Sequence, residues 1–234
     1  MKIAGFLLMF LAASVCAEEI RVLSGGAAKS FIDPLAAAFP GHRVKIEYQP
    51  MGRLTRSLAE GAAPDMIVVT AEVLQALKLE GTPIARVGIG VAVHENAPLP
   101  DISNAEAFKR TLLAAKSVVY IDPKTGTSGK HVLEVLKKLN IEEEMSRKTT
   151  LGTGGYVTAP VGRGEIELGI HQISQILPVK GVKLAGPLPP ELQKYTVYVA
   201  VNLKNHPAVG EFISHLGGPQ ARSRLAQSGY TTPE

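Results

Sequence analysis

The chain has 234 residues, a formal net charge of +4 and a single cysteine. Lysine and arginine are scattered along it rather than clustered, so the charge argues against a nucleic-acid-binding protein. This length fits either one large domain or two lobes of about 100 residues each. Without cysteine pairs, the fold must rest on an apolar core rather than on disulfides.

The first 17 residues have the pattern of a secretory signal peptide. Lys2 precedes the apolar run 3–13, which is too short to span a bilayer, and a small-residue cleavage site follows. We expect cleavage after Ala17 and a periplasmic mature protein that works without cytosolic ATP or NAD. Lipidation of Cys16 is the alternative, although Val15 is bulkier than the small residue expected directly before a lipidated cysteine.

Strand and helix patterns alternate three times after the leader. Short apolar runs predict strands, and the segments between them have helical spacing. The strands are expected at 20–23, 44–48 and 66–69, and the helices at 27–39, 54–60 and 72–79. This alternation predicts a parallel sheet with helices on its faces.

The pattern changes near Arg86, and a second set of elements follows. Strands are expected at 87–93, 118–121, 149–151, 168–170, 182–184 and 195–201, and helices at 104–114, 128–139, 157–163, 207–216 and 219–228. We expect segments 87–93 and 195–201 to connect two lobes, with the last two helices packed on the first lobe.

The predicted fold class is therefore α/β with two lobes. Each lobe is expected to be a mixed, mostly parallel sheet flanked by helices, with a ligand cleft between the lobes. Lobe 1 is expected to contain residues 18–88 and 200–234, and lobe 2 residues 89–199.

Three turns between a strand and a helix are rich in glycine and hydroxyl residues. Glycine lets the backbone approach a ligand closely, and the first N–H groups of a helix have no internal partner. Such turns can hold an anion at the carboxyl ends of strands, although they are also often glycine-rich for geometry alone. The candidate ligand-binding residues in them are Ser24, Gly25, Gly26, Thr125, Ser128, Gly129, Thr153, Gly154, Gly155 and Tyr156.

Five further residues are candidates for the same cleft. Gly52 and Arg53 begin a helix, where the guanidinium would suit a carboxylate or phosphate if it faces the cleft. Thr70 ends a buried strand and can either reach the cleft or cap the next helix. His171 and Gln172 follow the strand 168–170, and for the histidine a ligand contact and a structural hydrogen bond are equally open.

The sequence offers little for catalysis or for a cofactor. Segment 126–131 departs from a phosphate-binding loop, because its glycines are too close and His131 replaces the hydroxyl that would hold magnesium. The six histidines show no metal-ligand spacing, so neither a metal nor a cofactor is expected. We expect a binding protein rather than an enzyme. The alternative is a secreted hydrolase of small anions, with Ser128 beside His131 or His171 as nucleophile and base.

Several short motifs follow one another in a characteristic order. They are Ser24-Gly25-Gly26, the segment 54–65, Asp122-Pro123 with Gly126, Arg163-Gly164-Glu165, Gly181-Val182-Lys183, Gly218-Pro219-Gln220-Ala221 and Gly229-Tyr230. With these motifs nearly all of the mature chain resembles the periplasmic molybdate-binding proteins, which are extracytoplasmic solute-binding proteins of ABC transporters. The resemblance implies two lobes that close over a small anionic ligand, a membrane ABC transporter permease as partner, and a monomer.

The chain departs from that family where the ligand would bind. The family's first loop has a serine near the place of Gly26, its second loop a serine run where this chain has 50–52, and a tyrosine where this chain has Gln172. Hydroxyl donors for a tetrahedral oxyanion are therefore missing, while Arg53 and His171 add larger polar groups.

We expect a small organic anion, a di- or tricarboxylate, as the ligand. Molybdate, tungstate or another inorganic oxyanion is the alternative. A third class of function is a receptor or adhesion accessory that presents a bound ligand to a membrane partner.

Overall fold

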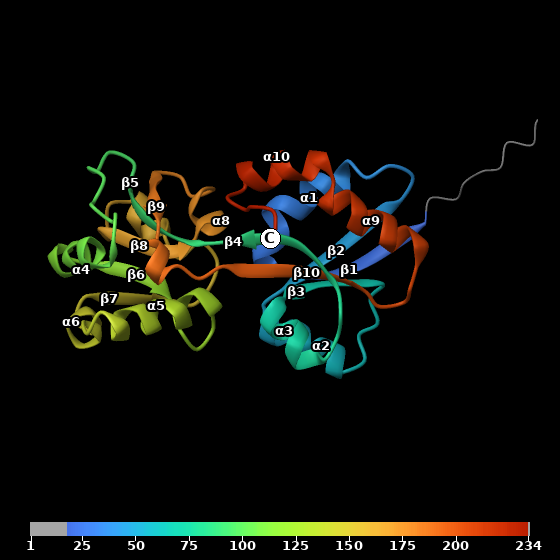
Figure 1. Cartoon of the computed structure of the whole chain (residues 1–234), viewed down its shortest axis with the longest axis horizontal. Coiled ribbons are helices and arrows are strands. Elements are labelled where there is room, and N and C mark those ends of the chain that lie inside the picture. Colours follow the sequence, from blue (N-terminus) through green and yellow to red (C-terminus); the bar gives the residue numbers. More distant parts are fainter. Residues whose placement is uncertain (1–17, 234) are drawn as a thin grey trace, which may run out of the picture.

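The computed structural model describes residues 18–233, so the predicted signal peptide lies outside the described residues. The described chain forms two lobes side by side along its long axis, each built on one five-stranded sheet (Figure 1). This arrangement confirms the predicted α/β class with two lobes. None of the described helices is long and apolar enough to cross a membrane.

Lobe 1 contains the sheet β2-β1-β3-β10-β4. β1 pairs in parallel with β2 and with β3, whereas β10 runs antiparallel to both of its neighbours. β3 is buried along its whole length, as its continuous apolar run predicts. The strands are β1 (Glu19–Gly25), β2 (Arg43–Gln49), β3 (Met66–Thr70), β4 (Thr82–Val87) and β10 (Thr196–Asn202).

Helices cover both faces of the lobe 1 sheet (Figure 1). One face packs against α1, α9 and α10 through a core that includes Phe31, Phe212 and Tyr230. The other face packs against α2 and α3, with Leu54 and Ile67 in a second cluster. The elements are η1 (Gly26–Ala28), α1 (Lys29–Ala37), α2 (Met51–Ala59), α3 (Ala71–Leu77), α9 (Pro207–Gly217) and α10 (Pro219–Gln227).

Lobe 2 contains the sheet β7-β6-β8-β5-β9. β6 pairs in parallel with β7 and β8, and β5 runs antiparallel to β8 and β9. Its largest core cluster includes Phe108, Leu136 and Ile170. The strands are β5 (Ile89–His94), β6 (Val118–Ile121), β7 (Thr149–Gly152), β8 (Leu168–Gln172) and β9 (Val182–Pro187). The helices are α4 (Ala105–Ala114), α5 (Thr127–Lys138), α6 (Glu142–Ser146), α7 (Ala159–Gly162), α8 (Ile173–Ile176) and η2 (Pro190–Leu192).

The prediction of one continuous strand over 87–93 was wrong, because the structure divides this segment between the two sheets. β4 ends at Val87 in lobe 1 and β5 begins at Ile89 in lobe 2, so Gly88 forms the joint. The return connection precedes β10 and runs beside this joint. Gln193 Oε1 accepts the Ile89 N–H at 2.8 Å, and Gln193 Nε2 donates to the Ile89 carbonyl at 2.9 Å. The two crossings are therefore tied together at one point.

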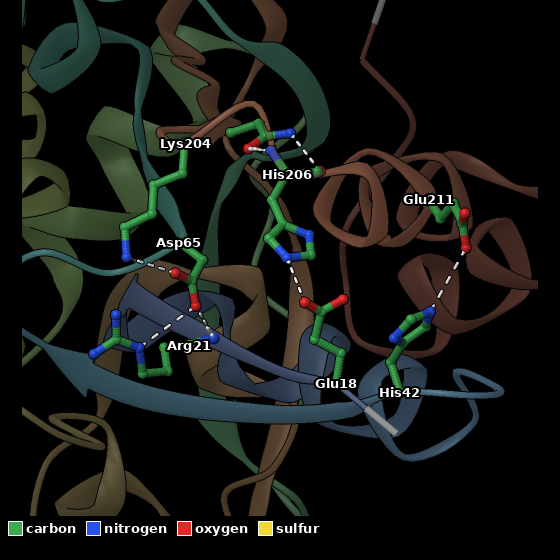
Figure 2. A network of polar contacts seen from close by, with 8 residues as sticks. Glu18, Arg21, His42, Asp65, Lys204, His206 and Glu211 are labelled. Carbon is green, nitrogen blue, oxygen red and sulfur yellow. Dashed lines mark hydrogen bonds and ion pairs between the residues drawn. The ribbon is translucent and has the colours of Figure 1, made fainter. Parts of the chain in front are cut away.

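A polar network fastens the start of β1 to the segment that follows β10 (Figure 2). The Asp65 carboxylate accepts the backbone N–H of Arg21 at 2.8 Å and Lys204 Nζ at 2.7 Å. Nearby, His206 Nε2 lies 2.9 Å from Glu18 Oε1. These contacts hold the first described strand in lobe 1.

Candidate ligand-binding site

The turns that follow the parallel strands lie where the two lobes meet. In each lobe three neighbouring strands run parallel, β2-β1-β3 and β7-β6-β8, so their carboxyl ends share one edge of the sheet. Ligands of open α/β sheets bind beyond such carboxyl ends. Two pockets at this place are lined by residues of both lobes.

The smaller inter-lobe pocket has a volume of about 70 Å³ and lies beside the connection that precedes β10. Lobe 1 contributes Thr70 and Glu72 to it, and lobe 2 contributes Thr127 and Ser128. The Glu72 carboxylate is already paired, since Lys194 Nζ lies 3.3 Å from its Oε1. The pocket therefore presents hydroxyl groups without an unpaired acid.

The larger inter-lobe pocket has a volume of about 340 Å³. Its lining comes from η1 and α1 of lobe 1, and from the β7–α7 turn and α8 of lobe 2. The residues that line it are Gly26, Lys29, Ser30, Asp33, Pro34, Tyr156, Ser174 and Gln175. This volume lies at the lower end of the range of about 300–1,000 Å³ that is usual for small-molecule pockets.

Lys29 places a positive charge in the larger pocket. Its Nζ lies 5.6 Å from the centre of the Tyr48 ring, a cation–π contact. The nearby acid, Asp33, instead accepts the Tyr48 hydroxyl at 2.5 Å. Burial and this contact with Asp33 raise the pKa of the Tyr48 phenol. Among the described residues, Lys29 therefore has no carboxylate partner.

Residues 171–175 lie between the linings of the two pockets. Gln172 Nε2 donates to Thr196 Oγ1 at 3.0 Å, and Thr196 lines the smaller pocket. Two and three residues further along, Ser174 and Gln175 line the larger one. One short stretch of lobe 2 thus contacts the wall of the smaller pocket and lines the larger one.

His171 is a buried, neutral group at the start of this stretch. Its Nδ1 lies 2.7 Å from the Gln172 backbone nitrogen and 3.3 Å from Ser128 Oγ. Because the backbone N–H can only donate, Nδ1 accepts and the ring proton sits on Nε2. Burial lowers the pKa of His171 to about 4. The imidazole is therefore uncharged at neutral pH, and its Nε2–H has no partner among the described residues.

Helices at the cleft begin with their N–H groups uncapped. No side chain caps η1, α2, α5 or α8, and none of them has an acidic residue in its first turn. In contrast, Thr70 caps α3 by accepting the Val73 N–H at 3.4 Å, and Asn104 caps α4. The uncapped start of α5 leaves free donors and a positive partial charge for an anion, whereas the first N–H of α8 donates to the Gly88 carbonyl at 3.0 Å.

Several of the residues that the sequence predicts for the ligand lie at these pockets. Gly26 and Tyr156 line the larger pocket, and Thr70 and Ser128 line the smaller one. His171 and Gln172 lie on the stretch between them. Ser24 is fully buried beneath the first turn and donates to the Gly25 carbonyl at 3.2 Å.

Gly25 is covered by a side chain that the sequence analysis did not consider. The methyl group of Met51 occupies the place where a Cβ on Gly25 would lie, with a Tyr198 ring carbon 3.8 Å away. Gly26 and Gly52, in contrast, have no heavy atom within 4 Å of a built Cβ. In the first turn there is thus space for a side chain at Gly26 but none at Gly25.

The remaining glycine-rich positions have local structural roles. Gly154 and Gly155 have φ of 149° and 65°, which other residues rarely adopt, and neither they nor Thr153 line the inter-lobe pockets. Gly129 packs against the Ile121 carbonyl, where no side chain fits. Thr125 donates to the Asp122 carbonyl at 3.1 Å and closes its own turn.

Arg53 lines neither inter-lobe pocket. Instead it lines a groove of about 660 Å³ formed by lobe 1 alone, together with Arg21, Lys45, Glu47 and Gln49. The third position of α2 therefore turns the side chain toward β2 and away from lobe 2. The sequence predicted a ligand contact for this arginine only if it faces the cleft, and helix rotation cannot be read from its motif.

Four residues line the larger pocket that the sequence did not predict for the ligand: Lys29, Ser30, Ser174 and Gln175. The signal for Lys29 was present, since it directly follows the first glycine-rich turn. For Ser174 and Gln175 the sequence carried no such signal, because α8 has only four residues, too short a stretch to show a helical period.

Two serine–histidine pairs were considered for a hydrolase, and the structure shows a contact between Ser128 and His171 only. Ser128 and His171 are close, but the Nδ1 that would take the serine proton already accepts the Gln172 N–H. His131 Nε2 lies 2.7 Å from the Leu192 carbonyl, and its Nδ1 lies 3.4 Å from Glu134. Within residues 18–233 no group of three or more histidine, cysteine, aspartate or glutamate residues could hold a metal ion.

Comparison with known proteins identifies the family. The sequence profile described as bacterial extracellular solute-binding protein matches residues 20–231. An aconitate isomerase from Pseudomonas sp is 30% identical over 228 residues, covering 90% of this chain and 86% of that protein. The molybdate-binding protein ModA of Azotobacter vinelandii is 26% identical over 234 residues, and the match covers 92% of this chain and 92% of that protein.

A solved structure with a similar fold comes from the same kind of protein. The substrate-binding domain of a putative molybdenum ABC transporter from Clostridium difficile superposes with a TM-score of 0.74 at 17% identity, covering 93% of this chain and 100% of that one. The resemblance to periplasmic molybdate-binding proteins is thereby confirmed. The chain belongs to the bacterial extracellular solute-binding proteins.

Proposed function

We propose that this chain is a periplasmic solute-binding protein that delivers a small organic acid, a di- or tricarboxylate, to a membrane ABC transporter. The family supports the binding role, and the aconitate isomerase relative supports the ligand class, because aconitate is a tricarboxylate. As in other two-lobed proteins of this kind, binding would close the lobes over the ligand.

One observation carries the proposed charge of the ligand. Of the two acids that line the inter-lobe pockets, Glu72 is paired with Lys194, and Asp33 accepts the Tyr48 hydroxyl and keeps its negative charge. Among the described residues the Lys29 ammonium has no carboxylate partner, and α5 begins without a side-chain cap. The free ammonium and the uncapped start of α5 favour an anion over a cation.

The size of the site favours an organic anion over an inorganic oxyanion. The larger pocket holds about 340 Å³ and includes the apolar ring of Pro34 and the Tyr156 side chain in its lining. A carbon skeleton can fill such a space, whereas a tetrahedral oxyanion offers neither carbon atoms nor comparable size.

The two crossings between the lobes provide a place for closure. Gly88 and the segment before β10 are the chain connections between the sheets, and Gln193 ties them together. Rotation about this point would bring the Lys29 side of the cleft and residues 171–175 together around the ligand.

A thermal-shift panel tests the ligand class. The mature protein is mixed with cis-aconitate, trans-aconitate, citrate, tricarballylate, succinate, molybdate, tungstate and sulfate at equal ionic strength. At about 100 times the dissociation constant a ligand adds about 2.7 kcal/mol of stability, which is readily seen. We expect a shift with at least one polycarboxylate. Stabilisation by molybdate alone would contradict the proposal and restore the inorganic alternative.

A second candidate function is isomerisation of an unsaturated polycarboxylate. The observation that favours it is the 30% identity to an aconitate isomerase over most of both chains. Proton transfer would need a base, and His171, with a pKa of about 4, is a weak one. Proton NMR of cis-aconitate incubated with the protein decides between the roles: a cis-to-trans ratio that changes with time identifies an enzyme, and an unchanged ratio a carrier.

A further inference from the structure

We infer that the pocket around Lys29 is a carboxylate subsite that holds one end of the ligand, so that the ligand must carry a second anionic group. This inference rests on the proposed function and goes beyond it by assigning one carboxylate to one place. It starts from the only cation that lines the larger pocket within the described chain.

Lys29 has the position and the freedom to bind an anion. It is the first residue of α1 and directly follows η1, whose first residue Gly26 has no helical partner for its N–H. No atom lies within 4 Å of a Cβ built on Gly26, so this backbone is open to the pocket. The Tyr48 ring under the ammonium supports its position without neutralising its charge. An ammonium in this open part of the pocket suits a carboxylate, because the two form a charge-assisted hydrogen bond.

The wall of this pocket is fixed by groups from both lobes. Tyr230 donates its hydroxyl to the Ala27 carbonyl, and the hydroxyls of Ser30 and Ser174 lie close to its phenol oxygen. Ser30 belongs to lobe 1 and Ser174 to lobe 2, and both hydroxyl oxygens are buried. The groups that remain open on the lobe 2 side are those of Tyr156 and Gln175, which line the same pocket. The subsite is therefore completed only when the lobes are together.

The smaller pocket can hold the second end of the ligand by different means. It contains the hydroxyls of Thr70, Thr127 and Ser128 and the uncapped start of α5. Its only lysine, Lys194, is occupied by Glu72. Gln172 bonds to Thr196 in the wall of this pocket, and Ser174 and Gln175 line the Lys29 pocket. One short stretch thus separates the two pockets, and one extended anion would span it. The Lys29 end is charge-based, and the α5 end relies on neutral donors.

The test is isothermal titration of tricarballylate into the wild-type protein, Lys29→Met and Lys45→Met. Lys45 is the matched control, an exposed lysine of lobe 1 that lines the groove away from lobe 2. Loss of a charge-assisted hydrogen bond predicts at least a tenfold weaker affinity for Lys29→Met and no change for Lys45→Met. Lys29→Gln, which keeps an amide donor but no charge, should be weakened as well.

A second ligand separates a subsite from a general loss of binding. A monocarboxylate such as butyrate, which can fill only one end, should lose less affinity than tricarballylate on Lys29→Met if it binds at the α5 end. Unchanged tricarballylate affinity in Lys29→Met would overturn the subsite and leave the proposed function intact. A wild-type protein that binds no polycarboxylate would overturn both. Melting temperatures of the variants report whether they fold.

Discussion

Ser128 and His171 meet at the carboxyl ends of β6 and β8, with Ser128 Oγ 3.3 Å from His171 Nδ1. The Gln172 N–H reaches the same nitrogen at 2.7 Å, so Nδ1 is an acceptor and carries no proton. Lobe 2 thereby holds a neutral imidazole at the cleft, with its Nε2–H as a donor. This arrangement places an uncharged imidazole behind Ser128, which lines the smaller pocket.

The buried His171 should make the protein less stable in mild acid. Burial lowers the pKa of His171 to about 4, whereas an unfolded histidine titrates near 6.5. Between these values the unfolded chain binds a proton that the folded chain does not. Stability is therefore complete above pH about 6.5 and falls as the pH drops toward 4. We expect a loss of about 2 kcal/mol between pH 7 and pH 5, measured by urea unfolding.

The variant His171→Gln serves as the comparison for that measurement. It keeps an amide acceptor but cannot titrate, so its stability should depend less on pH between 7 and 5. A variant with the same pH dependence as the wild type would show that other histidines are responsible.

The contact between Gly25 and Met51 should be sensitive to a single methyl group. Gly25 has φ −62° and ψ 137°, which alanine adopts without strain, so only the Met51 methyl opposes Gly25→Ala. We expect the substitution to push the flexible end of the Met51 side chain aside and to lower the free energy of unfolding by about 1 kcal/mol, the low end for overpacking. In the double variant with Met51→Ala, stability should recover toward that of Met51→Ala alone. Full additivity of the two effects would contradict the contact.

The Asp65 network in Figure 2 should stabilise lobe 1 above pH 4 and fail below it. Burial alone would raise the pKa of Asp65, but hydrogen bonds from Lys204 and the Arg21 N–H outweigh it and hold the pKa at about 2. Its contribution is therefore complete above the unfolded value of about 3.9 and is lost as the pH falls through 2. Because the side chains of Lys204 and Arg21 are 40% and 55% exposed, we expect only about 1–2 kcal/mol.

Unfolding of Asp65→Asn measures this contribution. The variant should be less stable than the wild type at pH 6, and the difference should shrink toward pH 2. Glu80→Gln, at an exposed carboxylate, is the control and should leave stability unchanged. Equal stability of Asp65→Asn and wild type at pH 6 would mean that the network contributes nothing.

Gly229 should control how closely the lobes approach. It follows α10 of lobe 1 with φ 76°, and a Cβ there would lie 2.7 Å from Ile173 Cγ2 and 2.9 Å from Leu177 Cδ1 in and beside α8 of lobe 2. Gly229→Ala should therefore destabilise the protein and push the lobes apart, with weaker ligand binding although Gly229 lines neither inter-lobe pocket.

Small-angle X-ray scattering and ligand titration check this prediction together. Gly229→Ala should increase the radius of gyration with ligand present and weaken the affinity several-fold. Gly210→Ala, in α9 with open space at its Cβ, is the matched control and should be neutral or stabilising. If the ligand-bound Gly229→Ala variant were as compact as the wild type and bound the ligand as tightly, the proposed role of Gly229 in the approach of the lobes would be contradicted.

The sequence predicted the fold well because the strands of this chain carry clear patterns. The expected strand 118–121 is β6 as observed, and β3 differs by one residue at Thr70. Continuous apolar runs mark buried parallel strands, and prolines and glycines mark the ends of helices. The division of 87–93 at Gly88 was missed because Val87 and Ile89 on either side of it are both buried, so hydrophobicity does not change where the chain leaves one sheet for another.

The site was predicted less completely, because its residues depend on side-chain direction. Glycine-rich turns indicated the sheet edges where the inter-lobe pockets lie, yet Arg53 points to a groove of lobe 1 and Lys29 lines an inter-lobe pocket. Both are basic residues near the start of a helix, and only the rotation of each helix distinguishes them. The cover of Met51 over Gly25 is a tertiary contact between two turns, which no local pattern reveals.

Isothermal titration of one protein sample with trans-aconitate and then with molybdate tests the central claim most directly. The proposed function predicts saturable binding of one trans-aconitate or a closely related polycarboxylate per chain, and no competition by molybdate at equal concentration. Tight binding of molybdate, with no heat from any polycarboxylate, would contradict it and return the chain to the inorganic oxyanions of its molybdate-binding relatives.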